Sequence, residues 1–220
     1  MSLIYSGKLW LIQKFVSGFS NNAYLVSCKQ TNTSIIIDTP ENPSELIRAA
    51  RTKNISGIYI THGHQDHLAG FADVYREFPV PVGIGKKDSQ SIPLTPESIL
   101  SIRDDTTKQF GSIVIRSIST PGHTPGSTCF LLPAESPGSQ PQLFSGDTLF
   151  PGGPGKSSSH KTFLQLLNSI TEKLHNLPDL TKVLPGHGTF TTIKESKEEY
   201  EYFKNKPMSE NTYGDIVWKK

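Results

Sequence analysis

Residues 61–67 contain the feature that most constrains this chain, because they hold three histidines and one aspartate within six consecutive positions. The segment reads Thr-His-Gly-His-Gln-Asp-His and follows directly on the apolar run at 58–60. We expect that run to end a buried strand, which would fix the following side chains at one edge of a sheet. Imidazole and carboxylate groups suit Zn²⁺ and similar divalent ions. The predicted ligands in this segment are His62, His64, Asp66 and His67.

The order of the remaining elements favours an α/β fold. Apolar runs with turn residues between them predict strands at 8–16, 23–29, 33–38, 55–60, 79–84, 113–118, 127–132, 142–144 and 182–185. Helical spacing predicts helices at 44–53, 68–78, 159–175 and 193–204, the second beginning at or just after His67 and the third capped by Ser159. Strands followed by helices occur twice, with a break near residue 110. We therefore expect one domain over 1–220, a four-layer αβ/βα sandwich of two mixed β-sheets with helices on the outer faces.

Three segments give weaker patterns. Residues 86–110 are polar and lack a clean period, so we expect a surface excursion with a short hairpin or helix. The Gly-rich segment at 152–155 is expected to be a loop with little tendency to order itself. Residues 205–220 are expected to form a tail that is folded back by Tyr213, Ile216, Val217 and Trp218.

Composition argues against several classes of protein. The formal net charge is +2 and the sequence contains no long run of Lys and Arg, which disfavours nucleic-acid binding. No apolar stretch approaches the roughly 20 residues of a membrane span, and the N-terminus does not resemble a signal peptide. Cys28 and Cys129 are isolated, so we expect buried, reduced thiols rather than a disulfide or a thiolate zinc site. These features predict a cytoplasmic protein with a small-molecule substrate and no membrane partner, as a monomer or homodimer.

Four other predicted strands end near a histidine or a carboxylate. The residues concerned are Asp38, His123, Asp147 and His187. His62 and His64 alternate and could share one ion with His123, whereas Asp66 and His67 would face a second ion with His187. A carboxylate can bridge two ions, so Asp147 is the expected bridge, with a water of lowered pKa as the nucleophile. Asp38 is expected to orient the metal-binding loop by hydrogen bonds. His160 and His175 are not expected to be ligands, and His175 should interact with a helix dipole.

Together these residues resemble the motif set of the metallo-β-lactamase superfamily. The segments at 61–70, 120–126 and 146–150 are most similar to its glyoxalase II branch. The resemblance implies a dinuclear metallohydrolase in which Asp66 helps to orient the nucleophile, with zinc as the expected ion and iron or manganese as alternatives. It also implies that Lys156 meets the substrate. The chain departs from that branch at Ser158 and Thr189, where glyoxalase II has aromatic hydroxyls, and a complete glutathione-binding C-terminal domain is not expected.

The expected reaction is hydrolysis of a small thioester or ester by a metal-bridging hydroxide, as in a hydroxyacylglutathione hydrolase. A mononuclear-iron persulfide dioxygenase is the first alternative, and it would use fewer of these side chains as ligands. A lactonase and a nuclease or phosphodiesterase rank below it. The nuclease branch usually needs an inserted domain or long arm and a basic groove, and the sequence shows neither. A fold that keeps only a structural metal is the non-enzymatic alternative.

Overall fold

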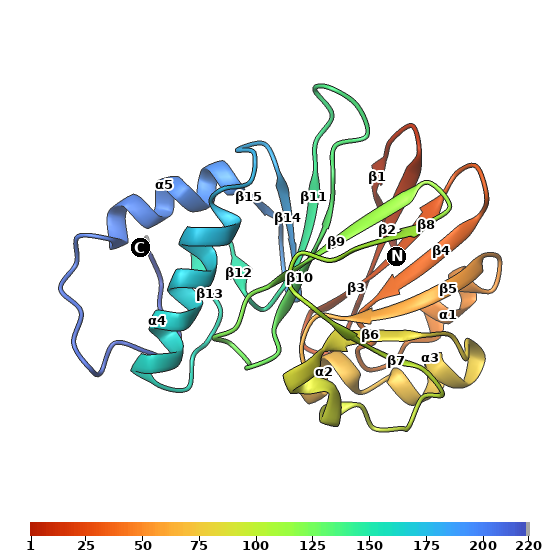
Figure 1. Ribbon diagram of the computed structural model, residues 1–220, viewed down its shortest axis with the longest axis horizontal. Helices are drawn as coiled ribbons and strands as arrows, with labels where there is room; N and C mark the ends of the chain where they lie inside the picture. The colour runs from red at the N-terminus through yellow and green to blue at the C-terminus, as the bar shows by residue number, and fades with distance from the viewer. Residues whose placement is uncertain (219–220) are drawn as a thin grey trace.

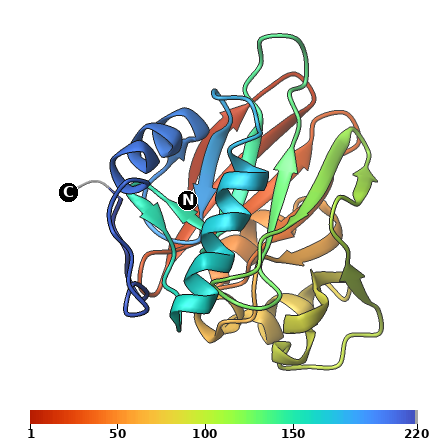
Figure 2. The same ribbon diagram turned by 60° about the vertical axis from the view of Figure 1, so that its left-hand side comes forward.

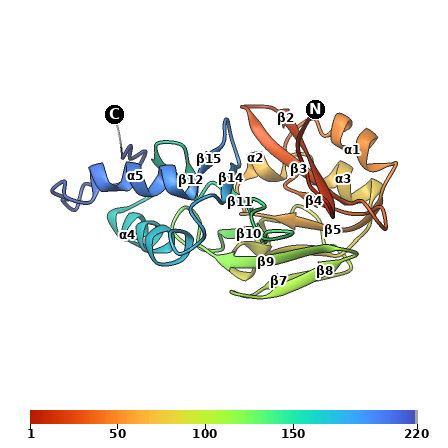
Figure 3. The ribbon, with the colours of Figure 1, turned by 90° about the horizontal axis from the view of Figure 1, so that it is seen from above.

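The computed structural model describes residues 1–218, in which two β-sheets pack face to face and helices cover their outer faces (Figure 1). Seen from above, α1 and α3 lie at one end of the molecule, and α4 and α5 lie at the other (Figure 3). This arrangement has the four layers that the order of elements predicts. Within residues 1–218, no helix is both long and apolar enough to cross a membrane.

The first sheet has seven strands in the order β1-β2-β3-β4-β5-β6-β7. Its strands are antiparallel from β1 to β4 and parallel from β4 to β7. Their bounds are β1 (Ser2–Ser6), β2 (Trp10–Ser17), β3 (Asn21–Cys28), β4 (Thr33–Ile37), β5 (Asn54–Ile60), β6 (Val82–Gly85) and β7 (Ile99–Ile102). Helices α1 (Ser44–Ala50), α2 (Gln65–Leu68) and α3 (Phe71–Glu77) follow β4 and β5.

The second sheet has six strands in the order β15-β14-β11-β10-β9-β8, with only β11 and β14 parallel. Its strands are β8 (Thr107–Phe110), β9 (Ile113–Ser119), β10 (Thr128–Leu132), β11 (Gln142–Gly146), β14 (Lys182–Pro185) and β15 (Thr191–Thr192). Helix α4 (His160–Ser169) lies across this sheet and continues as a π-helix, η2 (Ile170–Leu174) (Figure 2). Helix α5 (Ile193–Phe203) lies beside it.

Alternation along the strands builds three apolar layers between the four structural layers. On β3, Leu25 packs toward the helices of the first sheet, whereas Tyr24 and Val26 pack toward the second sheet. Every residue of β3 is buried, because both faces of this central strand are covered. A third layer, which contains Phe163 and Trp218, lies between the second sheet and α4 and α5.

The predicted helix at 68–78 is wrong in its start, because the chain forms two short helices that break at Gly70. The Gly70 N–H donates to the Thr39 carbonyl at 2.9 Å, which takes this residue out of a continuous helix. A Cβ on Gly70 would come within 2.3 Å of the Pro40 carbonyl oxygen. The close packing of the loop after β4 therefore sets the break, and it leaves α2 as a separate turn that carries Asp66 and His67.

The segment at 86–110 contains a short helix, η1 (Lys86–Ser91), which is one of the two alternatives predicted for it. Strand β7 joins the first sheet and β8 joins the second, so the two strands do not pair with each other. The Gly-rich segment at 152–155 is also more ordered than predicted, because β12 (Leu149–Phe150) pairs with β13 (Gly153–Pro154).

The tail after α5 folds back against that helix (Figure 2). Trp218 is fully buried and Ile216 packs beside it, as predicted. Tyr213 and Val217 are 45% and 50% exposed, so the prediction that they anchor the tail is wrong. Lys219 and Lys220, the last residues of the predicted tail, lie outside the described residues.

Candidate metal centre

The seven predicted ligand side chains come from four segments that meet at one edge of the sandwich. Strands β5, β11 and β14 all end there, and the loop between β9 and β10 reaches the same edge. Two backbone hydrogen bonds join the sheets at this point. The Thr128 N–H donates to the Thr61 carbonyl at 2.9 Å, and the Asn22 N–H donates to the Gly186 carbonyl at 2.7 Å. The ends of strands from both sheets are therefore held together, as ligand sites at the carboxyl ends of strands require.

The donor atoms of these side chains fall into three overlapping groups, in each of which the atoms lie within 4.8 Å of one another. The groups are His62 with His64 and His123, then Asp66 with His67 and His187, and finally His62 with His67 and Asp147. The first two groups contain the same residues as the two ligand sets that residue spacing predicts. The third joins them, because it takes one histidine from each and adds the aspartate.

Asp147 lies between the two histidine groups. Its Oδ1 is 3.4 Å from His67 Nε2, and its Oδ2 is 3.5 Å from His187 Nε2. The same Oδ2 is 3.7 Å from the Nε2 of His123, which belongs to the other group. One carboxylate thus faces both groups, which is the geometry that a bridging ligand needs.

The other ring nitrogen of four histidines is already engaged. Nδ1 of His123 is 2.7 Å from the Lys156 carbonyl, and Nδ1 of His187 is 3.3 Å from the Phe19 carbonyl. A carbonyl can only accept, so these two rings carry a proton on Nδ1 and turn Nε2 toward the cluster. Nδ1 of His67 faces the Asp38 carboxylate at 3.1 Å, and Nδ1 of His62 faces the Thr61 hydroxyl at 3.1 Å. Such partners are typical of histidines that bind a metal through the other nitrogen.

Several of the atoms that face the cluster are buried and have no hydrogen-bond partner among residues 1–218. They are Nε2 of His62, Nε2 of His123 and Oδ1 of Asp147. A buried polar atom without a partner is destabilising, by about 1–3 kcal/mol. A divalent cation would satisfy all of these atoms, since each is an electron-pair donor. The donor set therefore fits a metal ion.

The histidines of the two groups differ in their pKa, which is lowered for His62 and raised for His67 and His187. Burial, with the nearby His67, holds the pKa of His62 well below its usual value, so that ring is neutral and ready to donate an electron pair. Burial opposes protonation of His67 as well, but the nearby carboxylates of Asp147 and Asp38 raise its pKa to about 10. Hydrogen bonds to Asp147 and Asp66 likewise raise the pKa of His187 to about 10. The carboxylates thus attract positive charge to the place where a bound cation would supply it.

Asp38 lies behind the cluster rather than in it. It is buried, and Oδ1 accepts a hydrogen bond from the Thr61 N–H at 2.8 Å. Its Oδ2 accepts from the Thr61 hydroxyl at 2.8 Å and lies 3.1 Å from His67 Nδ1. One carboxylate therefore fixes both the start of the histidine segment and the orientation of His67, as its place at a strand end predicts.

Asp88 is a further buried carboxylate that the sequence analysis missed. Its Oδ2 accepts hydrogen bonds from the Gly63 N–H at 2.8 Å and from the Thr124 hydroxyl at 2.6 Å. Its Oδ1 accepts from the Gly126 N–H at 2.7 Å. Asp88 thereby connects the loop of His62 and His64 to the loop of His123. The signal that could have found it is the same one that marks Asp38, since Asp88 follows the end of β6.

Asn21 was also missed, because a polar residue at the start of an N-terminal strand carries no special signal. Its amide donates to Asp66 Oδ2 at 2.9 Å and lies 3.4 Å from His187 Nε2. The hydrogen bond from His187 is the main cause that lowers the pKa of the Asp66 carboxyl, and the hydrogen bond from Asn21 adds to it, although partial burial acts in the opposite direction. Asp66 is therefore an anion with a fixed orientation.

Glycine is required where the loops pass closest to Asp147. A Cβ on Gly186 would lie 2.3 Å from Asp147 Oδ1 and 2.5 Å from His67 Cε1. Gly146 has a φ of 50°, and a Cβ there would lie 2.5 Å from the Thr61 hydroxyl. The absence of side chains at these two positions lets the ligand-bearing loops come together.

A cavity of about 300 Å³ opens beside His123 and Asp147. Its other walls are the β12–β13 turn, Lys156 and the tail residues Asp215, Ile216 and Val217. Lys156 Nζ lies 3.9 Å from Asp215 Oδ2, and both side chains are mostly exposed. The cavity is thus largely apolar, with the Lys156–Asp215 ion pair in one wall and His123 and Asp147 of the candidate ligand cluster in another.

The two histidines that were not expected to be ligands lie elsewhere. His160 Nδ1 is 3.1 Å from the Thr212 carbonyl, which ties α4 to the tail. His175 Nε2 is 3.0 Å from the Ser196 hydroxyl, and burial lowers its pKa to about 4. His175 lies at the C-terminal end of η2, where it was expected, and the interaction of its ring with the helix dipole stays a prediction.

Known proteins are similar to this chain both in sequence and in fold. The profile of the metallo-beta-lactamase superfamily matches residues 16–201. A hydroxyacylglutathione hydrolase of Bartonella quintana is 31% identical over 179 residues, which cover 80% of this chain and 66% of the relative. The chain therefore spans just under two thirds of that relative's length.

Solved structures are similar to this chain in fold as well. A metallo-beta-lactamase from Staphylococcus aureus superposes with a TM-score of 0.76 at 28% identity, over 88% of this chain and 62% of the other. The protein TTHA1623, solved in a di-iron-bound form, superposes with a TM-score of 0.68 at 27% identity. That match covers 83% of this chain and 96% of TTHA1623.

Proposed function

Since this chain belongs to the metallo-β-lactamase superfamily, we propose that it is a dinuclear metal-dependent hydrolase that cleaves a small thioester or ester. Membership confirms the fold class and the family resemblance that the motifs predict. The observation that carries the proposal is the position of Asp147, whose carboxylate faces both histidine groups at 3.4–3.7 Å. A single structural metal would not need two groups with a carboxylate between them.

Each group of side chains has a defined part in this proposal. His62, His64 and His123 would hold one ion, Asp66, His67 and His187 would hold the other, and Asp147 would contact both. When bound, such a pair lowers the pKa of a water molecule toward neutrality and polarises the substrate carbonyl. Zinc is the expected ion, with iron or manganese as alternatives, because the same imidazole and carboxylate set accepts all three.

Asp66 is proposed to act on the attacking water. Its Oδ2 is fixed by the Asn21 amide at 2.9 Å and by His187 Nε2 at 3.1 Å, whereas its side chain is 41% exposed toward solvent. An exposed anion held at the edge of the cluster can accept a hydrogen bond from the water and direct its lone pair at the substrate. Buried Asp38 cannot do so, because its oxygens already accept from Thr61 and His67.

The cavity beside the cluster supports a small acyl thioester as the substrate. Phe150 and Val217 offer apolar contact surface, and Lys156 at the rim could receive an anionic group. The relative from Bartonella quintana is named a hydroxyacylglutathione hydrolase, and hydroxyacylglutathione carries both a thioester and anionic carboxylates. We therefore propose a hydroxyacyl thioester as the first substrate to test. Lys156 and the tail would bind its glutathione part.

The test is a hydrolase screen of zinc-loaded protein with metal analysis on the same sample. Thioester hydrolysis by protein that holds two ions per chain would support the proposal. Hydroxyacylglutathione should be compared with a thioester of the same acyl group on a short neutral thiol, which shows whether the glutathione part is recognised. Oxygen consumption with glutathione persulfide, in protein that holds one iron per chain and does not hydrolyse thioesters, would instead identify a dioxygenase and contradict the proposal.

A further inference from the structure

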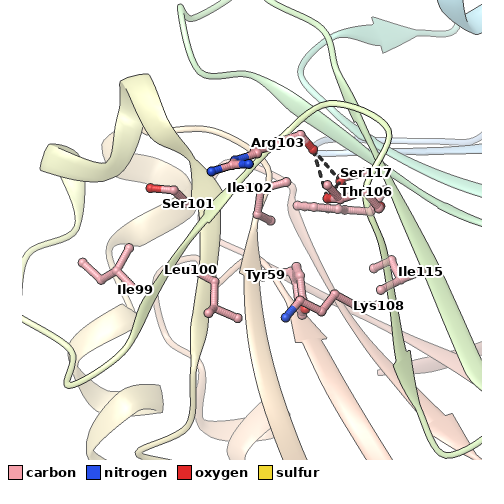
Figure 4. Close-up of a pocket in the computed structure, with 11 residues that line it drawn as sticks. Tyr59, Ile99, Leu100, Ser101, Ile102, Arg103, Thr106, Lys108, Ile115 and Ser117 are labelled. Carbon is pink, nitrogen blue, oxygen red and sulfur yellow. Dashed lines mark hydrogen bonds between the residues drawn. The ribbon is translucent and has the colours of Figure 1, made fainter.

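A second cavity, of about 270 Å³, lies between the two sheets at β7, β8 and β9. Leu100 and Ile102 of β7 lie on one side of it, and Ile115 of β9 lies on the other (Figure 4). None of the seven predicted metal ligands is among its lining residues. The cavity is therefore a separate site, and what it binds does not depend on the proposed hydrolase activity.

The wall of this cavity includes a buried tyrosine with an unused polar group. The Tyr59 ring packs edge-on against Phe110 and Phe130, with ring centroids 5.9 and 5.3 Å away. Gly57 and Gly83 on either side leave room for the ring, since a Cβ at Gly83 would lie 2.8 Å from it. Tyr59 is 3% exposed, and its hydroxyl has no hydrogen-bond partner within residues 1–218.

Burial raises the pKa of Tyr59 to about 12, so its hydroxyl keeps its proton. It is therefore a hydrogen-bond donor that lacks an acceptor. A buried donor in that state is destabilising by about 1–3 kcal/mol unless a ligand or water supplies the acceptor. An oxygen-bearing ligand in this cavity would supply one.

The charged residues of the cavity are all cations. Arg103 and Lys108 line it, and no carboxylate does. Over residues 1–218, neither side chain forms an ion pair, because the neighbouring Asp104 and Asp105 pair with Lys173 and Arg116 instead. The Arg103 carbonyl is fixed by the Thr106 and Ser117 hydroxyls, both at 3.0 Å (Figure 4). The backbone of Arg103 is therefore fixed, whereas its guanidinium has no ion-pair partner within residues 1–218.

From these contacts we propose that the cavity binds a small amphipathic carboxylate. The apolar part would lie between Leu100, Ile102 and Ile115, and the carboxylate would meet Lys108, with one oxygen accepting from the Tyr59 hydroxyl, while Arg103 adds positive charge at the other end of the cavity (Figure 4). The volume is about nine times the ~30 Å³ that a water molecule occupies in the liquid, which suits a ligand of roughly ten heavy atoms.

The experiment compares octanoate with octan-1-ol, which has the same apolar chain and no charge. Binding to the zinc-loaded protein is measured by titration calorimetry at pH 7.5. Octanoate should bind about tenfold more tightly than octan-1-ol, because a hydrogen bond to a charged group is stronger than one between neutral groups. The double variant Arg103→Met and Lys108→Met should remove that difference, while octan-1-ol binding changes by less than about twofold.

A filled cavity provides the second variant. Leu100→Trp should abolish the binding of both molecules, because its indole would occupy the space between β7 and β9. Octanoate binding that persists in Leu100→Trp, or that is unchanged in the double variant, would place the anion at another site and overturn the proposal. Equal affinity for octanoate and octan-1-ol in the unmodified protein, or no binding of either, would overturn it as well.

Discussion

At the scale of single residues, buried carboxylates determine how the candidate metal centre is assembled. Asp147 faces both histidine groups, whereas Asp38 and Asp88 lie behind them and accept hydrogen bonds from the loops. The two outer carboxylates have different tasks. Asp38 orients the ring of His67, and Asp88 holds two loops at a fixed distance from each other. Loss of either should therefore affect activity without removing a metal ligand.

Asp88→Asn should lower kcat for thioester hydrolysis by about 10–100-fold, which is the usual effect of removing a partner that supports a metal ligand. An amide keeps the size of the side chain but cannot accept from Gly63, Thr124 and Gly126 at the same time. The measurement is steady-state kinetics together with zinc content. Asp73→Asn is the matched control, because Asp73 is an exposed partner of Arg76 on α3. Equal rates for the two variants would show that Asp88 does not position the loops.

At the scale of elements, the tail after α5 serves as a wall of the cavity beside the metal cluster. Trp218 anchors it, since its N–H donates to the Gly152 carbonyl at 2.8 Å and its ring packs against Tyr200 and Phe203. Ser157 and Gly214 add two reciprocal backbone hydrogen bonds at 3.1 Å. The tail is thus attached at both ends of the segment that faces the cavity.

Trp218→Ala should raise KM for the thioester several-fold and lower the free energy of unfolding by about 3 kcal/mol, the low end for a buried tryptophan, because the tail can relax. The kcat value should change less, since Trp218 does not contact the ligand cluster. Urea unfolding and Michaelis kinetics measure the two effects. Tyr213→Ala is the control, because that side chain is 45% exposed and should alter stability by less than about 0.5 kcal/mol. An unchanged KM in Trp218→Ala would argue against the tail as a wall of the substrate site.

The junction of η2, α5 and the tail should also make stability depend on pH. Burial, with the nearby positive charge of Lys197, lowers the pKa of His175 to about 4, below the value of about 6.5 expected in the unfolded chain. Between these values the unfolded state binds more protons, so stability falls as the pH falls from about 6.5 toward 4. The loss of unfolding free energy between pH 7.5 and pH 5.0 should be smaller in His175→Gln than in the unmodified protein. Equal losses, measured by urea unfolding, would contradict this.

Elements with a strong local pattern could be predicted from the sequence, and those set by distant pairing could not. Strand β14 and the capped start of α4 match their predicted bounds, because apolar runs and a Ser159 cap act locally. Strands β7 and β8 were missed, since they are short, partly exposed and stable only through pairing with different sheets. The ligand side chains were predictable from their repeated position at strand ends. Asp88 also follows a strand end, but its role was missed because it depends on loops that are distant in sequence.

At the scale of the whole molecule, the metal cluster lies at the edge where both sheets end. Each sheet supplies part of the ligand set, so a complete set requires the sheets to dock in one register. The backbone hydrogen bonds from Thr128 to Thr61 and from Asn22 to Gly186 fix that register. In the proposed function, the sandwich would therefore determine the reaction type, whereas the tail and the β12–β13 turn would determine which substrate can approach.

The most direct test of a two-metal centre is the zinc content and thioester hydrolysis of Asp147→Ala, measured on the same sample. The variant should hold fewer than two ions per chain and should lose hydrolysis, because within residues 1–218 no other carboxylate faces His67, His123 and His187 together. Asp73→Ala, treated identically, should keep two ions and the full rate. An Asp147→Ala protein that retains both ions and full hydrolysis would contradict the assignment of Asp147 as the bridge, and with it the proposed dinuclear mechanism.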